Sequence, residues 1–505
     1  MKNKLYLNNL FTPEMTLKSV FLKPWYIFLL SVFFVLHGFT ENFFLIPVKD
    51  TLVFLFYCLG ISVILVGLFW MFFKNIQKAA FLAFLLLAFN FFFGYVHDGL
   101  KLFFPTSFVT KYSIILSGTC VLFVILAILL KKRKDFSKRL TLYLNLLFFS
   151  FIVIDIGVLI KKSLFLPYRE EKGLSVKKAI SCSKENLPDV YLIVADEYAG
   201  SKDLADICGF DNTPFLDSLR QRGFFVANNS RSNYNYTTYS MASILNMDYL
   251  PLKQKQIEKA DHGYALKLIL NNKVTSFFEK AGYQIRNYSS LDIKGQPAQN
   301  NNSFIPARTT LFTSQTLINR LKRDVWLNAA RMLNLRGVLI KSLYENLRYN
   351  QQIYQHAINN IHASDTTPEF VYIHLQLPHY PYYYDKEGNL YPLEKISTDA
   401  PGNTKNYVEY VQYTNQQLIR LIDETLKYNR LPPIIILMGD HGYRCFPEGA
   451  DSYIFLNLFS IYMPNKNYSH FNDSLTNVNV FRMLLNSAFC QQLPMLKDTC
   501  ITVHN

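Results

Sequence analysis

The sequence predicts a membrane domain of five helices followed by an α/β domain with a mainly parallel central sheet. Apolar residues of the 505-residue chain gather in its first third, and basic residues alternate between successive joints of that region. After residue 188, short apolar runs alternate with helical patterns. The expected organisation is a cytoplasmic tail at 1–23, a membrane domain at 24–160, a linker at 161–188 and an extracytoplasmic domain at 189–505.

The membrane domain is predicted from five apolar segments, each close to the roughly 20 residues that cross a bilayer. Core helices of a soluble protein are the alternative, but only short polar joints separate these segments, which argues against it. The segments are approximately Trp25–Leu45, Leu52–Phe73, Ala79–Val96, Tyr112–Leu130 and Leu140–Ile160.

Basic residues predict the orientation of these segments. They are concentrated in the N-terminal tail, in the second joint and in the fourth joint, where Lys131–Arg139 carries six. Because Lys and Arg accumulate on the cytoplasmic side, the N-terminus is expected inside and everything beyond Ile160 outside. The net charge of +15 therefore follows largely from topology and predicts no nucleic-acid partner. The first segment lacks a small-residue cleavage site, which favours an anchor over a removed signal peptide.

Five of the seven cysteines lie beyond the membrane segments, where the surroundings are expected to be oxidising. An odd number leaves at least one thiol without an intramolecular partner. The simplest pairing is Cys490 with Cys500.

Four short apolar runs are typical of buried strands, and the segments between them have helical patterns. This alternation predicts a mainly parallel sheet covered on both faces, with a site at the carboxyl ends of its strands. The polar stretch Gln284–Arg308 is expected to be mostly loop. The expected strands are Asp189–Ala195, Phe224–Ala227, Phe370–Leu375 and Ile434–Met438. The expected helical regions, whole or partial, are Ala265–Leu270, Thr275–Lys280, Thr316–Leu347 and Tyr407–Tyr428.

Two strand ends carry groups that suit a metal ion. Asp196 and Glu197 end the first strand, and their mutual repulsion would be relieved by a divalent cation. A solvated turn is the ordinary alternative for an isolated acidic pair. Asp440 and His441 follow the last strand between two glycines, where the backbone can approach a ligand closely. Carboxylate and imidazole ligands favour zinc, with manganese or calcium as alternatives.

Thr237 is the candidate nucleophile and a further metal ligand, because it lies where a polar, aromatic loop becomes a helix. Free backbone N–H groups at a helix start favour an anion, although an ordinary N-cap explains the same pattern. Thr238 is the fallback. His379 is a candidate to bind substrate phosphate or to protonate a leaving group. Asn233 is a second candidate substrate-binding residue.

His374 lies five positions before His379, inside an expected strand. Strand parity predicts a satisfied core histidine, so His374 is left out of the candidate site.

These residues resemble the alkaline phosphatase and sulfatase superfamily, and among its members the membrane-anchored phosphoethanolamine transferases and lipoteichoic acid synthases. The resemblance rests on Asp196, on Thr237 with Ser240 three positions later, on the run from Asp440 to Gly442, and on Pro378-His379. It implies that Asp196, Thr237, Asp440 and His441 hold the catalytic metal, with Glu197 beside them.

In enzymes of this kind, the headgroup of a membrane phospholipid passes to the threonine and then to an acceptor. The resemblance thus implies lipid A or an envelope glycan as acceptor, and a catalytic domain outside a bacterial inner membrane. Sulfatases have Pro and Arg after the nucleophile, whereas this chain has Tyr239 and Met241, so sulfate ester hydrolysis loses support. Phosphoglycerol transfer and simple ester hydrolysis stay open. An inactive envelope-binding scaffold and a transporter are the alternatives from other classes.

Overall fold

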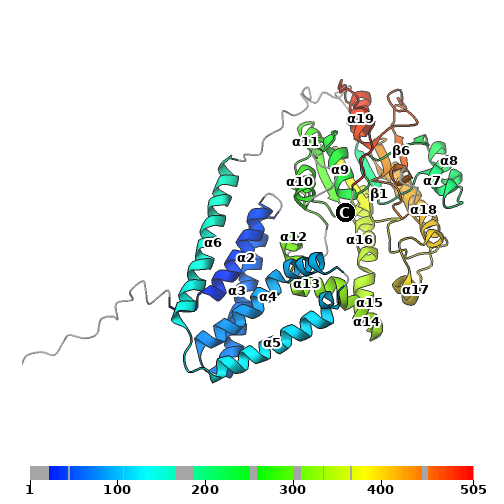
Figure 1. Cartoon of the computed structure of the whole chain (residues 1–505). Coiled ribbons are helices and arrows are strands. Elements are labelled where there is room, and N and C mark those ends of the chain that lie inside the picture. Colours follow the sequence, from blue (N-terminus) through cyan, green and yellow to red (C-terminus); the bar gives the residue numbers. More distant parts are fainter. Residues whose placement is uncertain are drawn as a thin grey trace, which may run out of the picture. The chain divides into compact units, whose positions relative to one another are not determined.

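A computed structural model describes the chain at residues 22–43, 46–105, 107–165, 187–250, 259–299, 309–333, 335–363, 367–445 and 453–503. The chain divides into two compact units, shown in Figure 1. One contains residues 1–169 and 303–328, and the other contains residues 170–302 and 329–505.

The first unit is a bundle of apolar helices, which confirms the predicted multi-span membrane domain. Four of these helices are long and apolar enough to cross a membrane, and α2 is shorter, with 16 residues. The Asn75 side chain caps α4 by accepting hydrogen bonds from two backbone N–H groups, which helps to fix where this helix begins. The helices are α2 (Tyr26–Glu41), α3 (Val48–Phe73), α4 (Ile76–Phe103), α5 (Tyr112–Lys132) and α6 (Lys138–Phe165), with a short 3₁₀ turn at Phe108–Thr110.

A short segment from much later in the sequence also belongs to this unit. It comprises α12 (Thr310–Thr313), α13 (Leu317–Leu321) and a π-helical turn at Lys322–Trp326. It lies within the range 189–505 that is expected to form the extracytoplasmic domain. In the structure it packs beside α2 and α4, as Figure 1 shows in green against blue.

The second unit is built on a six-stranded sheet with the order β2-β6-β5-β1-β4-β3. Strands β1, β3, β4 and β5 pair in parallel, whereas β6 runs antiparallel to β5 and β2. The predicted α/β class with a mainly parallel sheet is therefore confirmed. The strands are β1 (Val190–Ala195), β2 (Phe225–Ala227), β3 (Gln284–Tyr288), β4 (Glu369–Leu375), β5 (Ile434–Gly439) and β6 (Phe459–Tyr462).

Two strands were not predicted. β3 lies in the stretch expected to be loop. It is an edge strand whose alternate residues are polar and partly exposed, so its sequence lacks the apolar run of a buried strand. Its apolar face is reduced to Ile285, too little to distinguish it from a loop. β6 is only four residues long.

Helices cover both faces of the sheet. Val190, Leu192 and Val194 of β1 pack in one core with residues of α9, α10, α11 and α19. On the other face, Tyr191 hydrogen-bonds Asn429 at the end of α18. The helices are α7 (Ser201–Asp206), α8 (Thr213–Gln221), α9 (Thr237–Asn246), α10 (Lys259–Leu270), α11 (Lys273–Lys280), α14 (Leu327–Met332), α15 (Arg336–Leu343), α16 (Glu345–His362), α17 (Leu393–Thr398), α18 (Thr404–Tyr428) and α19 (Val480–Ala488). Single 3₁₀ turns occur at Tyr453–Phe455 and Asn477–Asn479.

Candidate active site

The register of three neighbouring strands brings acidic and imidazole side chains to one face of the sheet. Val194 of β1 lies beside His374 of β4 on one side and Met438 of β5 on the other. Side chains alternate along a strand, so residues two positions apart share a face. Asp196 and Asp440 therefore continue the face that carries Val194 and Met438, where α9 also packs.

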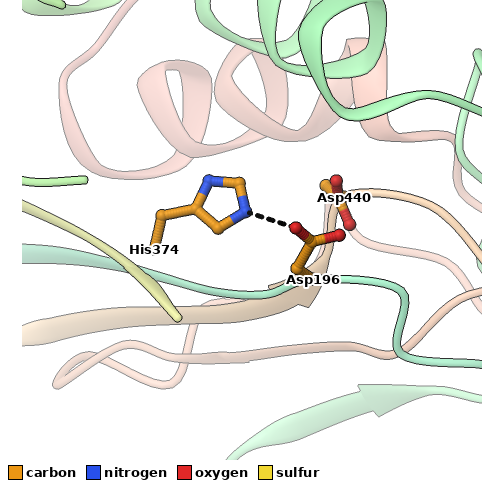
Figure 2. A group of neighbouring side chains, drawn as sticks. All are labelled: Asp196, His374 and Asp440. Atoms are coloured by element: carbon orange, nitrogen blue, oxygen red, sulfur yellow. Dashed lines mark ion pairs between the residues drawn. The ribbon is translucent and has the colours of Figure 1, made fainter. Parts of the chain in front are cut away.

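His374, Asp196 and Asp440 form a buried cluster at this position. Their ligand atoms all lie within 4.8 Å of one another, and at most 7% of any of these residues is exposed. Figure 2 shows His374 directed toward Asp196, with 3.9 Å between Nε2 and Oδ2, and Asp440 beside them. His374 was left out of the predicted site. Its Nδ1 is paired with the Tyr372 hydroxyl at 2.8 Å, but its Nε2 faces the acidic groups.

His441 joins the cluster from the turn after β5. Its Nε2 lies 3.4 Å from Asp440 Oδ2 and 3.8 Å from Asp196 Oδ1. Its Nδ1 lies 2.8 Å from the Gly442 carbonyl oxygen, which can only accept. Nδ1 therefore donates to that oxygen, and Nε2 is the ring nitrogen that faces the carboxylates and is available to a metal ion.

The glycine on either side of this turn is required by close packing. A Cβ atom on Gly439 would lie 2.9 Å from the Tyr198 carbonyl oxygen. On Gly442 it would lie 2.4 Å from the Leu456 carbonyl oxygen. Any larger residue would displace backbone, so the glycines hold Asp440 and His441 where they are.

Thr237 is the first residue of α9, and its hydroxyl faces this cluster. Thr237 Oγ1 lies 3.5 Å from Asp196 Oδ1 and 3.4 Å from His441 Nε2. The start of the helix adds free backbone N–H groups and a partial positive charge. Ser240, one turn later, donates a hydrogen bond to the Asp440 carbonyl oxygen and so ties α9 to the turn after β5.

The donor set fits a divalent metal ion. Among the described residues, Asp440 Oδ2 and His374 Nε2 are buried without a hydrogen-bond partner. Such orphan atoms are costly unless a ligand satisfies them. Burial, and next the charge of Asp440, raise the pKa of Asp196 above its usual range. A cation would offset both effects, and an oxygen and nitrogen donor set suits zinc or manganese.

Glu197, predicted as a further metal ligand, is placed differently. It adopts a left-handed backbone conformation with φ of 62°. Its Oε1 accepts hydrogen bonds from the backbone N and Nε of Arg444, at 3.2 and 3.1 Å. The buried carboxylate is thus neutralised by an arginine and not by the cluster around Asp440.

Arg444 was missed by sequence reasoning, although a cation two positions after Gly442 was a usable signal. Its guanidinium carbon lies 4.8 Å from the centre of the Tyr236 ring, and Tyr236 directly precedes Thr237. Its Nη2 lies 3.2 Å from His379 Nε2. Arginine therefore lies beside the candidate nucleophile, where an anionic substrate would be stabilised.

His379 lies beside this arginine and Glu197. Its Nδ1 donates to the Tyr380 carbonyl oxygen at 2.5 Å, and its Nε2 lies 3.6 Å from Glu197 Oε2. Burial lowers the pKa of His379. The charges of Asp196 and Glu197 outweigh burial, so the pKa ends above its usual value.

Asn233, predicted to bind substrate, has a different role in the structure. Only 1% of it is exposed, and its Oδ1 accepts the Val478 N–H at 2.7 Å. Its Nδ2 donates to the Tyr249 hydroxyl and to the Thr499 carbonyl oxygen, at 3.0 and 2.9 Å. Every polar atom of the amide is used in packing, which leaves little for a substrate.

Residues 499–503, called the strap, bind the loop that leads to Thr237. Ile501 N donates to the Asn233 carbonyl oxygen at 2.9 Å. Asn235 exchanges two hydrogen bonds with the backbone of Val503, at 2.8 and 3.2 Å. Cys500 has a free thiol that contacts the Ser232 carbonyl oxygen, so its predicted pairing with Cys490 is wrong.

Fold and site together define a membrane-anchored α/β protein with a buried acid–imidazole cluster facing a threonine at a helix start. A family model described as Sulfatase matches residues 188–481, which is more than half of the chain. The chain therefore belongs to the sulfatase family, within the alkaline phosphatase superfamily, and is an enzyme of that class. No curated protein matches the chain.

Several solved structures resemble the chain in fold. The C-terminal periplasmic domain of EptC from Escherichia coli is 16% identical, with a TM-score of 0.36, over 60% of this chain and 83% of that one. The integral membrane lipooligosaccharide phosphoethanolamine transferase A from Neisseria meningitidis is 13% identical, with a TM-score of 0.39, over 92% of this chain and 95% of that one. A putative sulfatase from Bacteroides fragilis is 15% identical, with a TM-score of 0.34, over 62% and 77%.

Proposed function

We propose that this enzyme transfers a phosphoethanolamine-type headgroup from a membrane phospholipid, through a phosphothreonine at Thr237, to a lipid or glycan of the cell envelope. The observation that carries the proposal is the position of the Thr237 hydroxyl. It lies 3.5 Å from a buried carboxylate oxygen and 3.4 Å from an imidazole nitrogen, at the start of a helix. A threonine needs such surroundings to become a nucleophile.

Asp196, Asp440, His441 and Thr237 would hold the metal, with His374 as a candidate fifth ligand. When bound, a divalent ion supplies Lewis acidity to a phosphoryl oxygen and lowers the pKa of a coordinated hydroxyl. Zinc is the first choice for these donors, with manganese and calcium as the other candidates. The chain's own part is to keep the ligands fixed: the glycines beside Asp440 and the hydrogen bond of His441 Nδ1 do so.

In the first half of the reaction, Thr237 Oγ1 forms a bond to the phosphorus of the donor. The bond from phosphorus to the diacylglycerol oxygen breaks, and that oxygen takes a proton to leave as diacylglycerol. The threonine proton passes toward Asp196 Oδ1, which faces the hydroxyl. His379 is positioned to supply the leaving-group proton, and Arg444 to bind phosphoryl oxygens.

In the second half, the oxygen of an acceptor hydroxyl forms a bond to the phosphorus and the bond from phosphorus to Thr237 Oγ1 breaks. The acceptor's proton passes to His379, and Asp196 returns the proton that it received to Thr237. Lipid A and an envelope glycan are the proposed acceptors. The topology supports these partners, because the basic joints predict that everything beyond Ile160 lies outside the membrane. The proposed location is a bacterial inner membrane, with the catalytic domain on its outer side.

To test the function, purified zinc-loaded protein is incubated with phospholipid vesicles of a defined headgroup. We expect diacylglycerol release from phosphatidylethanolamine vesicles and a headgroup adduct on the protein, both measured by mass spectrometry. Diacylglycerol release from phosphatidylglycerol vesicles only would mean that the transferred headgroup is phosphoglycerol. Turnover of the sulfate ester 4-nitrophenyl sulfate without any adduct on the protein would mean that the enzyme is a hydrolase and not a transferase. If neither lipid nor ester reacts and no metal binds, the scaffold interpretation is correct.

Replacing Arg444 by alanine is expected to weaken binding of inorganic phosphate. A hydrogen bond to a charged group contributes about 1.5–3 kcal/mol, which corresponds to roughly a 10- to 150-fold increase in Kd. Isothermal titration calorimetry of the zinc-loaded enzyme measures it. Arg222→Ala is the matched control, because Arg222 pairs with Asp423 away from the cluster. Equal affinity in Arg444→Ala and wild type would remove Arg444 from the substrate site.

A further inference from the structure

Residues 309–326, called the latch segment, are part of the membrane unit although they lie between strands of the catalytic fold in the sequence. The chain leaves the sheet at the carboxyl end of β3, forms the latch segment, and returns through α14. The chain therefore passes between the two units three times, near residues 169, 302 and 328. One connection would suffice to join an anchor to an enzyme.

Two glycines form the seat of the latch segment. A Cβ atom on Gly38 of α2 would lie 2.4 Å from the Phe312 ring, and one on Gly94 of α4 would lie 2.1 Å from Gln315 Oε1. Gly94 N also donates to the Gln315 carbonyl oxygen at 2.8 Å. At the other glycines of the helices α2 to α6, a Cβ atom would have nothing within 4 Å. These glycines are Gly60, Gly67, Gly99, Gly118 and Gly157. Close approach is thus confined to the two glycines under the latch segment.

Aromatic packing holds the start of the latch segment. The Phe312 ring lies 5.8 Å from the ring of Phe34 in α2 and 5.5 Å from that of Phe54 in α3, edge to face in both cases. Such pairs contribute beyond their buried area. Phe312 packs against the apolar core of the bundle as one of its own residues would.

Charged contacts hold the end of the latch segment. The Arg320 side chain is 7% exposed and pairs with Asp98 of α4. Asp324 accepts a hydrogen bond from the hydroxyl of Tyr112, the first residue of α5. Burying an arginine without a partner costs free energy, so the pair between Asp98 and Arg320 favours the docked position of the latch segment.

The Gly38 contact and the charged contacts lie toward helix ends that the basic joints predict to be extracytoplasmic. Gly38 is near the end of α2, Asp98 near the end of α4, and Tyr112 at the start of α5. A segment from beyond residue 160 can reach only that side of the membrane. The packing and the charge pattern therefore agree without depending on each other.

We propose that docking of the latch segment on this seat gives the catalytic domain a second attachment to the membrane unit, which favours reaction with a phospholipid in the bilayer. The inference rests on the proposed function and adds to it a role for the latch segment in the reaction with lipid. The predicted linker at 161–188 already joins the catalytic domain to the membrane domain, and a second attachment shortens its reach, which raises the effective concentration of the site near the lipid. Loss of docking should therefore reduce reaction with lipid in a bilayer and spare reaction with a small soluble ester.

The test uses Gly94→Leu in the full chain, reconstituted in phosphatidylethanolamine nanodiscs, with Gly99→Leu of the same helix as matched control. Hydrogen exchange of residues 310–321, followed by mass spectrometry, reports docking. We expect at least about tenfold faster exchange in Gly94→Leu only. Diacylglycerol release should fall about tenfold in the same variant, while cleavage of bis(4-nitrophenyl) phosphate stays at the wild-type rate.

A charge reversal keeps the result independent of any folding defect at Gly94. Asp98→Arg and Arg320→Asp should each release the latch segment, and the double variant should restore both protection and lipid turnover. Unchanged exchange in Gly94→Leu and in both single reversals would overturn docking. Faster exchange with unchanged lipid turnover would overturn the tether. A wild-type enzyme that releases no diacylglycerol would instead disprove the proposed function, and the exchange data would still decide docking.

Discussion

Thr237→Ala is expected to lower transfer by at least about 10⁴-fold, because removal of a covalent nucleophile leaves only binding and charge stabilisation. The headgroup adduct seen on the wild-type protein should disappear. Thr237 begins α9 and its hydroxyl faces the cluster, so alanine keeps the helix and removes the atom expected to react. Intact-mass measurement after incubation with phosphatidylethanolamine gives the result directly.

Thr238→Ala is the matched control for this experiment. It removes the same chemical group one position later, on the same partly exposed turn of α9. We expect its adduct and its turnover to match those of the wild type. An adduct on Thr237→Ala that is missing from Thr238→Ala would transfer the nucleophile's role to Thr238. An adduct on both variants would place the covalent step elsewhere.

Asp440→Asn is expected to have opposite effects with and without metal. In the metal-free enzyme it should raise the unfolding temperature, because it removes one of two buried carboxylates that repel each other. Asparagine can still accept from the backbone N–H groups of Glu197 and His441, and its amide faces His441 Nε2. With zinc present, the wild type should be the more stable protein, because binding to the folded state adds to its stability.

Calorimetry of both proteins, with and without zinc, measures this reversal, and elemental analysis gives the metal content. We expect about one zinc ion fewer in Asp440→Asn and a loss of transfer of roughly 10³-fold. Asp423→Asn is the control, since Asp423 is half exposed and pairs with Arg222. If Asp440→Asn destabilises the metal-free enzyme, repulsion between the carboxylates is not the dominant feature of the site.

The sequence predicted those parts of the molecule whose burial leaves a pattern. β1 and β5 are apolar throughout because both faces are covered, and the polar residues after them mark the sheet edge. Asp196 and Asp440 could be predicted for that reason, and the structure brings them together with Thr237 and His441. Their catalytic and metal-binding roles stay predictions, which the variants above test.

Other parts depend on contacts that one sequence does not display. Strand parity predicts a core position for His374, because it gives the face of the sheet but not the distance to the sheet edge. The pairing of Glu197 with Arg444 joins residues 247 positions apart, so an isolated acidic pair appeared free for a metal. The latch segment has the polar and apolar pattern of an ordinary helix, and only its seat at Gly38 and Gly94 shows where it belongs.

The strap has a consequence for the biogenesis of the enzyme. The loop before Thr237 is held by residues 266 and 268 positions later in the chain, at Thr499 and Val503. During synthesis, the acid at Asp196 and the nucleophile emerge long before the strand of backbone that fixes their geometry. A growing chain thus carries these groups in an unassembled state, and the candidate site is complete only when the strap is in place.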